Sequence, residues 1–139
     1  MLSLFIGFAL VAALGLGHHY GLLAVRETTK GSDNHPRRVV VLTFLGLLAI
    51  HTVEILAFAG AYKALLAWGG LGSFGGGFDE SWSGLVYFSG INFATLGYTQ
   101  IETSGPIRMI NMMQSLGGFM VLTWSATFLY SVSARAWQK

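Results

Sequence analysis

Tyr87 to Gln100, which reads YFSGINFATLGYTQ, is the stretch of sequence that decides the fold. Long hydrophobic segments precede and follow it, yet its glycine, serine and threonine content makes it too polar to face lipid. Backbone that is not helical can lie at membrane depth only where protein buries it or where it lines water. The stretch therefore predicts a re-entrant loop between two membrane-crossing segments.

The composition places the chain in a lipid bilayer. Hydrophobic residues make up 53% of its 139 residues and charged residues only 10%, which leaves too little polar surface to cover a soluble globule. Cysteine is absent, so disulfides, thiolate metal sites and cysteine nucleophiles are excluded. Basic and aromatic residues are not interleaved, which argues against a nucleic-acid partner, and no soluble partner is evident.

No set of residues predicts an enzyme. The serines near histidine lack a third, orienting carboxylate, no phosphate-binding loop is present, and the carboxylates are scattered along the chain. We therefore expect no catalytic residues and no organic cofactor.

Three segments are long and apolar enough to cross the membrane, at residues 2–25, 39–68 and 109–132. Each holds about 20 or more mostly apolar residues, and about 20 are needed to cross a 30 Å hydrocarbon core. A shorter helix is expected from Ser81 to Ala94, with the acidic residues just before it favouring the positive end of its dipole. The fold class is therefore an all-α membrane protein with three transmembrane helices and one re-entrant helix and loop.

The basic residues predict the orientation, because short loops rich in lysine and arginine stay in the cytoplasm. With the N-terminus outside and the C-terminus cytoplasmic, six basic residues fall inside and two fall outside. The six are Arg26, Lys30, Arg37, Arg38, Arg135 and Lys139, and the two are Lys63 and Arg108. In this orientation the short helix enters from outside, and its negative carboxyl end points to the membrane centre, where it stabilises a cation.

The segment Thr95-Leu96-Gly97-Tyr98-Thr99 resembles the TVGYG selectivity filter of the potassium channel pore-loop superfamily. The resemblance covers about residues 40–133, and the chain is similar to a small prokaryotic channel of this superfamily with two pore-forming helices and an extra N-terminal helix. It implies that residues 1–38 form a peripheral transmembrane helix and a cytoplasmic loop. Residues 39–139 would form the pore domain, with outer helix, turret, pore helix, filter and inner helix, in the prokaryotic inner membrane.

The resemblance implies that backbone carbonyl groups replace the water around a permeant K⁺ ion. The ion-ligating residues would be Thr95, Leu96, Gly97 and Tyr98, within a filter that ends at Thr99. Gly97 permits the backbone angles that turn successive carbonyl groups into one tube, whereas a Cβ would resist them. One chain holds one such loop and a tube needs four, so a homotetramer is expected.

Two positions depart from the pattern of the superfamily. Thr99 stands where a second glycine is expected, and Gln100 stands where aspartate is usual. A β-branched residue tolerates positive φ poorly, so the outermost ring of carbonyl groups should be weakened. The departure predicts a cation pore of reduced selectivity, in which Na⁺ also passes. It also leaves open the alternative that the chain is a non-conducting membrane assembly protein.

The third span carries two features that bear on gating. Gly117 and Gly118 lie in mid-helix, where they match the gating hinge of the superfamily, but they would equally allow close helix packing. A mildly polar stripe at helical spacing predicts the lining of the water-filled cavity. The stripe consists of Asn111, Gln114 or Ser115, Gly118, Leu122 and Ser125.

The first two spans carry His18, His19, His51 and Glu54 within their apolar sequence. His51 and Glu54 are three residues apart, hence on one helix face, and a carboxylate in a bilayer is costly enough to suggest a function. We expect the pair to support the filter or pore helix by hydrogen bonding, with pH sensing and metal or haem binding as alternatives. His18 or His19 with His51 would place two imidazoles on neighbouring helices, as in a small membrane subunit that binds haem or a metal.

Overall fold

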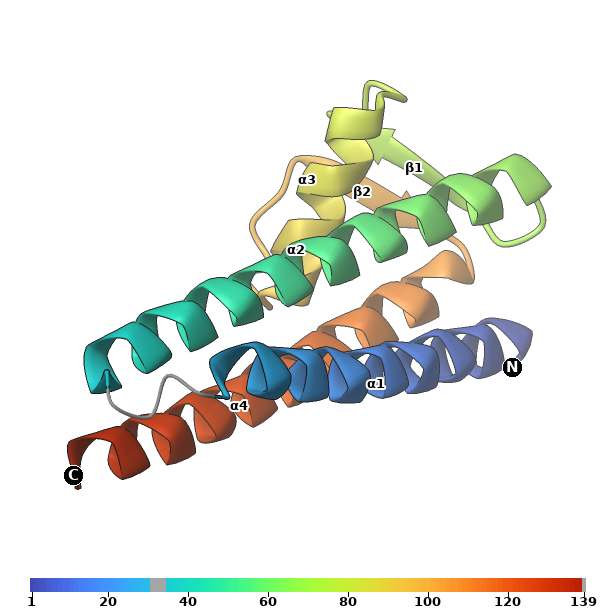
Figure 1. Cartoon of the computed structure of the whole chain (residues 1–139). Helices are drawn as coiled ribbons and strands as arrows, with labels where there is room; N and C mark the ends of the chain where they lie inside the picture. The colour runs from blue at the N-terminus through green and yellow to red at the C-terminus, as the bar shows by residue number, and fades with distance from the viewer. Residues whose placement is uncertain (31–34, 139) are drawn as a thin grey trace.

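The computed structural model describes residues 1–30 and 35–138, which are mostly helical (Figure 1). Three of the helices are long and apolar enough to cross a membrane. The elements in chain order are α1 (Leu2–Thr29), α2 (Pro36–Trp68), β1 (Ser73–Gly76), α3 (Trp82–Phe93), β2 (Ile101–Ser104) and α4 (Ile107–Trp137). The prediction of an all-α membrane fold with a short helix between the second and third spans is confirmed.

The helices extend beyond the apolar segments from which they were predicted. α2 begins at Pro36, whose fixed φ suits a first helical turn, and it ends where Gly69 adopts a left-handed φ of 76°. α1 continues past the last apolar residues through Arg26 to Thr29. Hydropathy marks the part of a helix that lies in lipid, so it misses turns that continue into the polar region.

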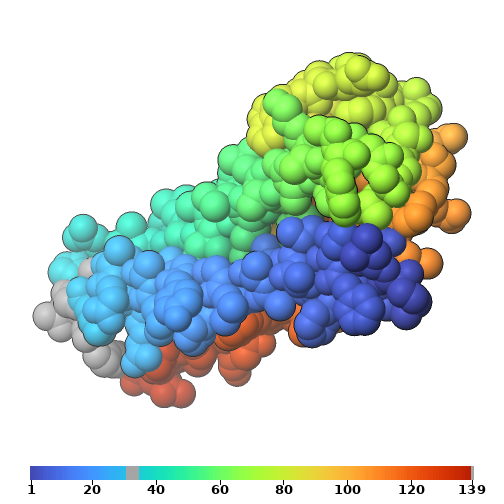
Figure 2. Space-filling model, turned by 90° about the vertical axis from the view of Figure 1, so that its right-hand side faces the viewer, coloured from blue at the N-terminus to red at the C-terminus, as the bar shows by residue number. Residues whose placement is uncertain are grey.

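The three long helices run side by side, and α3 leans against α2 and α4 at one end of the molecule (Figure 1). The N-terminus lies at the end that carries β1 and β2, and the C-terminus lies at the opposite end (Figure 1). α1 lies along the outside of the molecule, and α3 with the segments around it projects beyond the long helices (Figure 2). α1 packs against α2 and α4, and its separation from a pore domain stays a prediction.

A two-stranded antiparallel sheet, which the sequence did not predict, joins the two segments that flank α3. β1 pairs with β2 so that Phe74 lies opposite Thr103 and Gly76 lies opposite Ile101. Gly76 has φ 64°, and a Cβ there would lie 2.4 Å from the carbonyl oxygen of Gln100. The glycine-dense loop before α3 is therefore ordered by pairing, and its glycines permit the two backbones to approach closely.

The two glycines in the middle of α4 lie at close helix contacts. A Cβ on Gly118 would lie 2.1 Å from the carbonyl oxygen of Phe93, and one on Gly117 would lie 2.8 Å from the side chain of Val11. α4 is helical without interruption from Ile107 to Trp137. These contacts favour the close-packing explanation, and a gating hinge stays a prediction.

Part of the predicted cavity lining is excluded, because three members of the polar stripe on α4 face the inside of the subunit. Gln114 is fully buried, and Gly118 and Ser125 are also buried against other helices. The polar side chains of this face therefore serve contacts between helices. Helical spacing identified a common face but could not decide whether that face meets water or protein.

Candidate functional site

The segment from Thr95 to Thr99 follows the end of α3 and is not helical. Thr95 has φ 56° and Gly97 has φ 71°, so left-handed backbone recurs two residues apart. Positive φ was expected at Gly97 only. A β-branched residue in this region is strained by about 1–3 kcal/mol, and such strain clusters at functional sites.

The same segment is exposed on the surface of the single chain. Leu96 is 54% exposed and Tyr98 is 65% exposed, so neither side chain is covered by its own chain. Non-helical backbone at membrane depth needs neighbouring protein or water to satisfy its polar groups. The segment is thus an incomplete site that further protein must cover or that must face a water-filled pore.

α3 carries the segment on its carboxyl end. Its N-cap is Ser81, whose hydroxyl accepts a hydrogen bond from the Gly84 amide at 2.9 Å, and the Asp79 carboxylate accepts from the Ser81 amide and hydroxyl. The hydrogen bond from the Ser81 side chain holds the pKa of Asp79 below its ordinary value, so the N-terminus of α3 keeps a negative charge. The cap of α3 is therefore Ser81, and the predicted acidic charge lies just before the helix and not in its first turn.

A buried polar network that the sequence did not predict holds α3 against its neighbours. The Gln114 amide on α4 donates to the Ser89 hydroxyl at 2.8 Å and to the Ser89 carbonyl at 3.1 Å. The Tyr62 hydroxyl on α2 donates to the Gln114 carbonyl oxygen at 2.7 Å, and the Ser89 hydroxyl donates to the carbonyl of Ile55 at 2.8 Å. Three helices thus meet through hydrogen bonds around Ser89 in the middle of α3.

The far end of the segment turns back toward the sheet. The Thr99 hydroxyl accepts a hydrogen bond from the Ile101 amide at 3.1 Å, and the Gln100 carbonyl accepts from the Gly77 amide at 2.8 Å. Thr99 is not among the described residues with positive φ. The side chain of Thr99, which departs from the filter pattern, is therefore hydrogen-bonded within the turn. The backbone φ of Thr99 is not positive, whereas that of Gly97 is.

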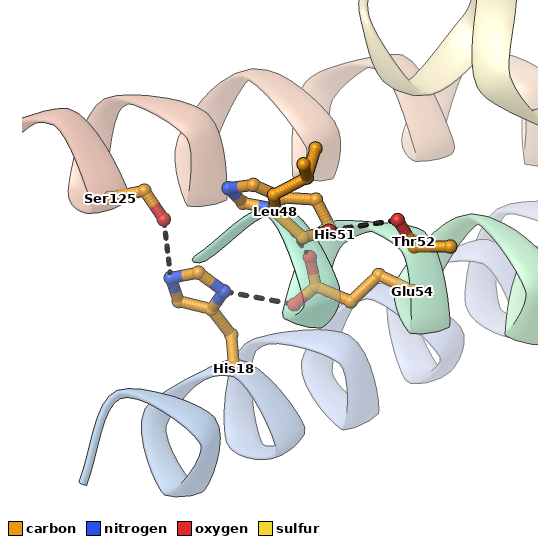
Figure 3. A network of polar contacts seen from close by, with 6 residues as sticks. All are labelled: His18, Leu48, His51, Thr52, Glu54 and Ser125. Atoms are coloured by element: carbon orange, nitrogen blue, oxygen red, sulfur yellow. Dashed lines mark hydrogen bonds and ion pairs between the residues drawn. The ribbon is translucent and has the colours of Figure 1, made fainter. Parts of the chain in front are cut away.

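A second polar site lies between the long helices, where α1, α2 and α4 meet (Figure 3). The His18 Nδ1 is 2.9 Å from Glu54 Oε1, and the His51 Nδ1 is 2.8 Å from Glu54 Oε2. The Ser125 hydroxyl lies 3.3 Å from the His18 Nε2. The hydrogen-bond partners of Glu54 are thus two imidazoles, rather than the pore helix as expected.

The remaining histidine of α1 takes no part in this cluster. His19 is exposed and its ring stacks on Trp124 with centroids 5.9 Å apart. His51, by contrast, packs its ring 5.5 Å from that of Phe93, the last residue of α3. Of the two histidines that the sequence left open as partners of His51, the structure selects His18, and the cluster adjoins the end of α3.

Comparison with known proteins supports a membrane transport role. A family model described as "Ion channel" matches residues 50–134, which is more than half of the chain. The match includes Glu54, α3, the non-helical segment and most of α4. No curated protein and no solved structure matches the chain.

Proposed function

The chain belongs to the ion channel family, and from this premise we propose that it is a passive, potassium-permeable cation channel whose filter is formed by residues 95–99. It is a multi-pass membrane protein with three helices able to cross the bilayer. Conduction would need no bound organic cofactor and would run down the electrochemical gradient. The permeant ion would be K⁺, with Na⁺ passing less readily.

The observation that carries the proposal is the exposed, non-helical segment between α3 and β2. Thr95 and Gly97 have positive φ, and Leu96 between them does not. Such alternation is what turns successive carbonyl groups to the same side of the chain. A single chain leaves this backbone uncovered. Four chains around one axis would enclose it and supply rings of oxygen atoms in place of the hydration shell of the ion. We therefore propose a homotetramer.

The short helix supports the same assignment. The end of α3 that Ser81 caps lies away from the long helices, and its carboxyl end lies toward their middle (Figure 1). The carboxyl end of a helix carries partial negative charge, which stabilises a cation nearby. Gln114 and Ser89 hold this helix in place, and His51 packs behind its last residue. We infer that His51, with Glu54 behind it, supports the filter.

The outer end of the filter determines how strongly the pore selects. Thr99 lacks positive φ and its hydroxyl is bonded to the Ile101 amide, which supports a weakened outermost ring. Discrimination between K⁺ and Na⁺ should therefore be lower than with glycine at this position. The distribution of basic residues supports an orientation with the N-terminus outside, and the resemblance to prokaryotic channels is the ground for proposing the prokaryotic inner membrane. Gly117 and Gly118 remain candidates for a gating hinge.

Currents through purified protein in a planar bilayer test the proposal. With K⁺ on one side and Na⁺ on the other, the reversal potential should be displaced in the direction that K⁺ preference requires. A displacement of zero would show a cation pore without potassium preference. A protein that inserts but passes no single-channel current would instead be the non-conducting assembly protein.

A further inference from the structure

We propose that His18, His51 and Glu54 form a binding site for a divalent transition-metal ion of the Zn²⁺ class. The inference does not rest on the proposed conduction pathway, because the site lies between α1 and the pore domain. Each residue offers one ligand atom, and these atoms all lie within 4.8 Å of one another. Two imidazole nitrogens and one carboxylate oxygen are a ligand set that such ions bind, with a fourth position left to water.

The distances already approach those that an ion requires. Zinc binds histidine nitrogen and carboxylate oxygen at about 2.0–2.2 Å, which separates tetrahedral ligands by roughly 3.3 Å. His18 Nδ1 lies 2.9 Å from Glu54 Oε1 and His51 Nδ1 lies 2.8 Å from Glu54 Oε2, so each of these two nitrogen–oxygen contacts would widen by about half an ångström around an ion. The rings of His18 and His51 are stacked with centroids 5.5 Å apart, which directs both toward the same carboxylate.

The surroundings favour a cation at this place. Glu54 is 6% exposed and His18 is fully buried, so the carboxylate charge lies in a low-dielectric environment. An uncompensated carboxylate in a bilayer is costly, and the side chains bonded to Glu54 are two imidazoles. No lysine or arginine of the described chain forms an ion pair with Glu54. A divalent ion would supply the missing positive charge.

Ser125 completes the site from the third helix. An imidazole that binds a metal through Nδ1 carries its proton on Nε2, and a hydrogen-bond partner for that proton fixes the tautomer and the ring orientation. The Ser125 hydroxyl, 3.3 Å from His18 Nε2, is placed to accept it. A neutral His18 would thus shift its proton from Nδ1 to Nε2 on binding. Ser125 is a positioning residue and not a ligand.

The geometry selects a small ion over haem. A bis-histidine haem needs a flat space between two imidazoles on opposite faces of the porphyrin. Here both imidazoles meet one carboxylate, and the nearby apolar groove between α1 and α2, of about 510 Å³, is lined by Glu54 but by neither His18 nor His51. A bound ion would cross-link α1 to α2 next to Phe93 at the end of α3.

Titration with Co²⁺, followed by visible absorption, tests the site on the intact, chelator-treated protein. We expect one Co²⁺ per chain, with ligand-field bands that Zn²⁺ abolishes by displacement. His18→Gln and His51→Gln, which retain a hydrogen-bonding group beside Glu54, should weaken Co²⁺ binding by more than about 100-fold. Ser125→Ala should weaken it by about 10- to 100-fold, as loss of an outer-shell partner does.

His19→Gln is the matched control, because His19 lies next to His18 in sequence but outside the cluster. It should bind Co²⁺ as the unmodified protein does, and size-exclusion profiles should show that all variants assemble alike. Absence of the bands in the unmodified protein, or unchanged binding in an assembled His18→Gln variant, would overturn the inference. Co²⁺ binding without ion currents would instead refute only the channel proposal.

Discussion

Gln114 offers the sharpest test of how α3 is held, because its side chain joins α2, α3 and α4. Replacement by leucine keeps a similar volume but removes the acceptor of the Tyr62 hydroxyl and the donor to Ser89. Both Tyr62 and Gln114 are fully buried, so the groups left behind cannot turn to water. A buried polar group without a partner costs about 1–3 kcal/mol, so Gln114→Leu should destabilise the chain by about 2–4 kcal/mol.

A double-mutant cycle separates the hydrogen bond from the general effect of each substitution. Tyr62→Phe alone should cost about 1–2 kcal/mol, because it leaves the Gln114 carbonyl oxygen unpaired. With both changes the cost should fall below the sum of the two by about 0.6–1.7 kcal/mol, the range of hydrogen-bond coupling inside membrane proteins. Reversible unfolding in mixed micelles containing sodium dodecyl sulfate, followed by circular dichroism, would measure these differences.

Tyr87→Phe is the matched control for this cycle. Tyr87 is 50% exposed on α3, so loss of its hydroxyl should change stability by less than about 0.5 kcal/mol. Additivity of Tyr62→Phe and Gln114→Leu within about 0.3 kcal/mol would refute the hydrogen bond between them. Equal stability of Gln114→Leu and the unmodified protein would refute the whole network behind α3.

Four further substitutions test the filter and α4. Gly97→Ala should abolish single-channel current while the assembly stays intact, because alanine resists a φ of 71°, and undiminished conductance would contradict the role of Gly97. Thr99→Gly should enlarge the reversal potential between K⁺ and Na⁺, since glycine restores the backbone freedom of the outermost ring, and an unchanged value would count against that account. Gly118→Ala should lower stability by about 1–3 kcal/mol and Gly117→Ala by less, because the first meets the backbone carbonyl of Phe93 and the second a side chain. Unfolding measurements would show the difference, and two fully stable variants with altered open probability would favour a hinge.

The sequence predicted the elements that hydropathy and capping specify. The three spans stand out as long apolar segments, and the start of α3 was predicted at Ser81, which is the N-cap of a helix from Trp82 to Phe93. The re-entrant segment was predicted because glycine and threonine between two spans cannot face lipid. These features depend on neighbouring residues in the chain, so a sequence displays them directly.

Features that depend on distant parts of the chain were missed or left open. β1 and β2 pair although α3 separates them in the sequence, and β1 is rich in glycine. No pattern of side chains in these segments predicts the pairing. The contact of His18 with Glu54 spans 36 residues and depends on how α1 rotates against α2. Positive φ at Thr95 was not expected, because a β-branched residue adopts it only where surrounding structure imposes it.

An experimental structure of the protein in Tl⁺, an electron-rich substitute for K⁺, tests the central claim most directly. We expect four chains around one axis, with Tl⁺ on that axis between rings of carbonyl oxygens from Thr95, Leu96 and Gly97. An assembly without fourfold symmetry, or residues 95–99 turned away from an ion-free axis, would contradict the account.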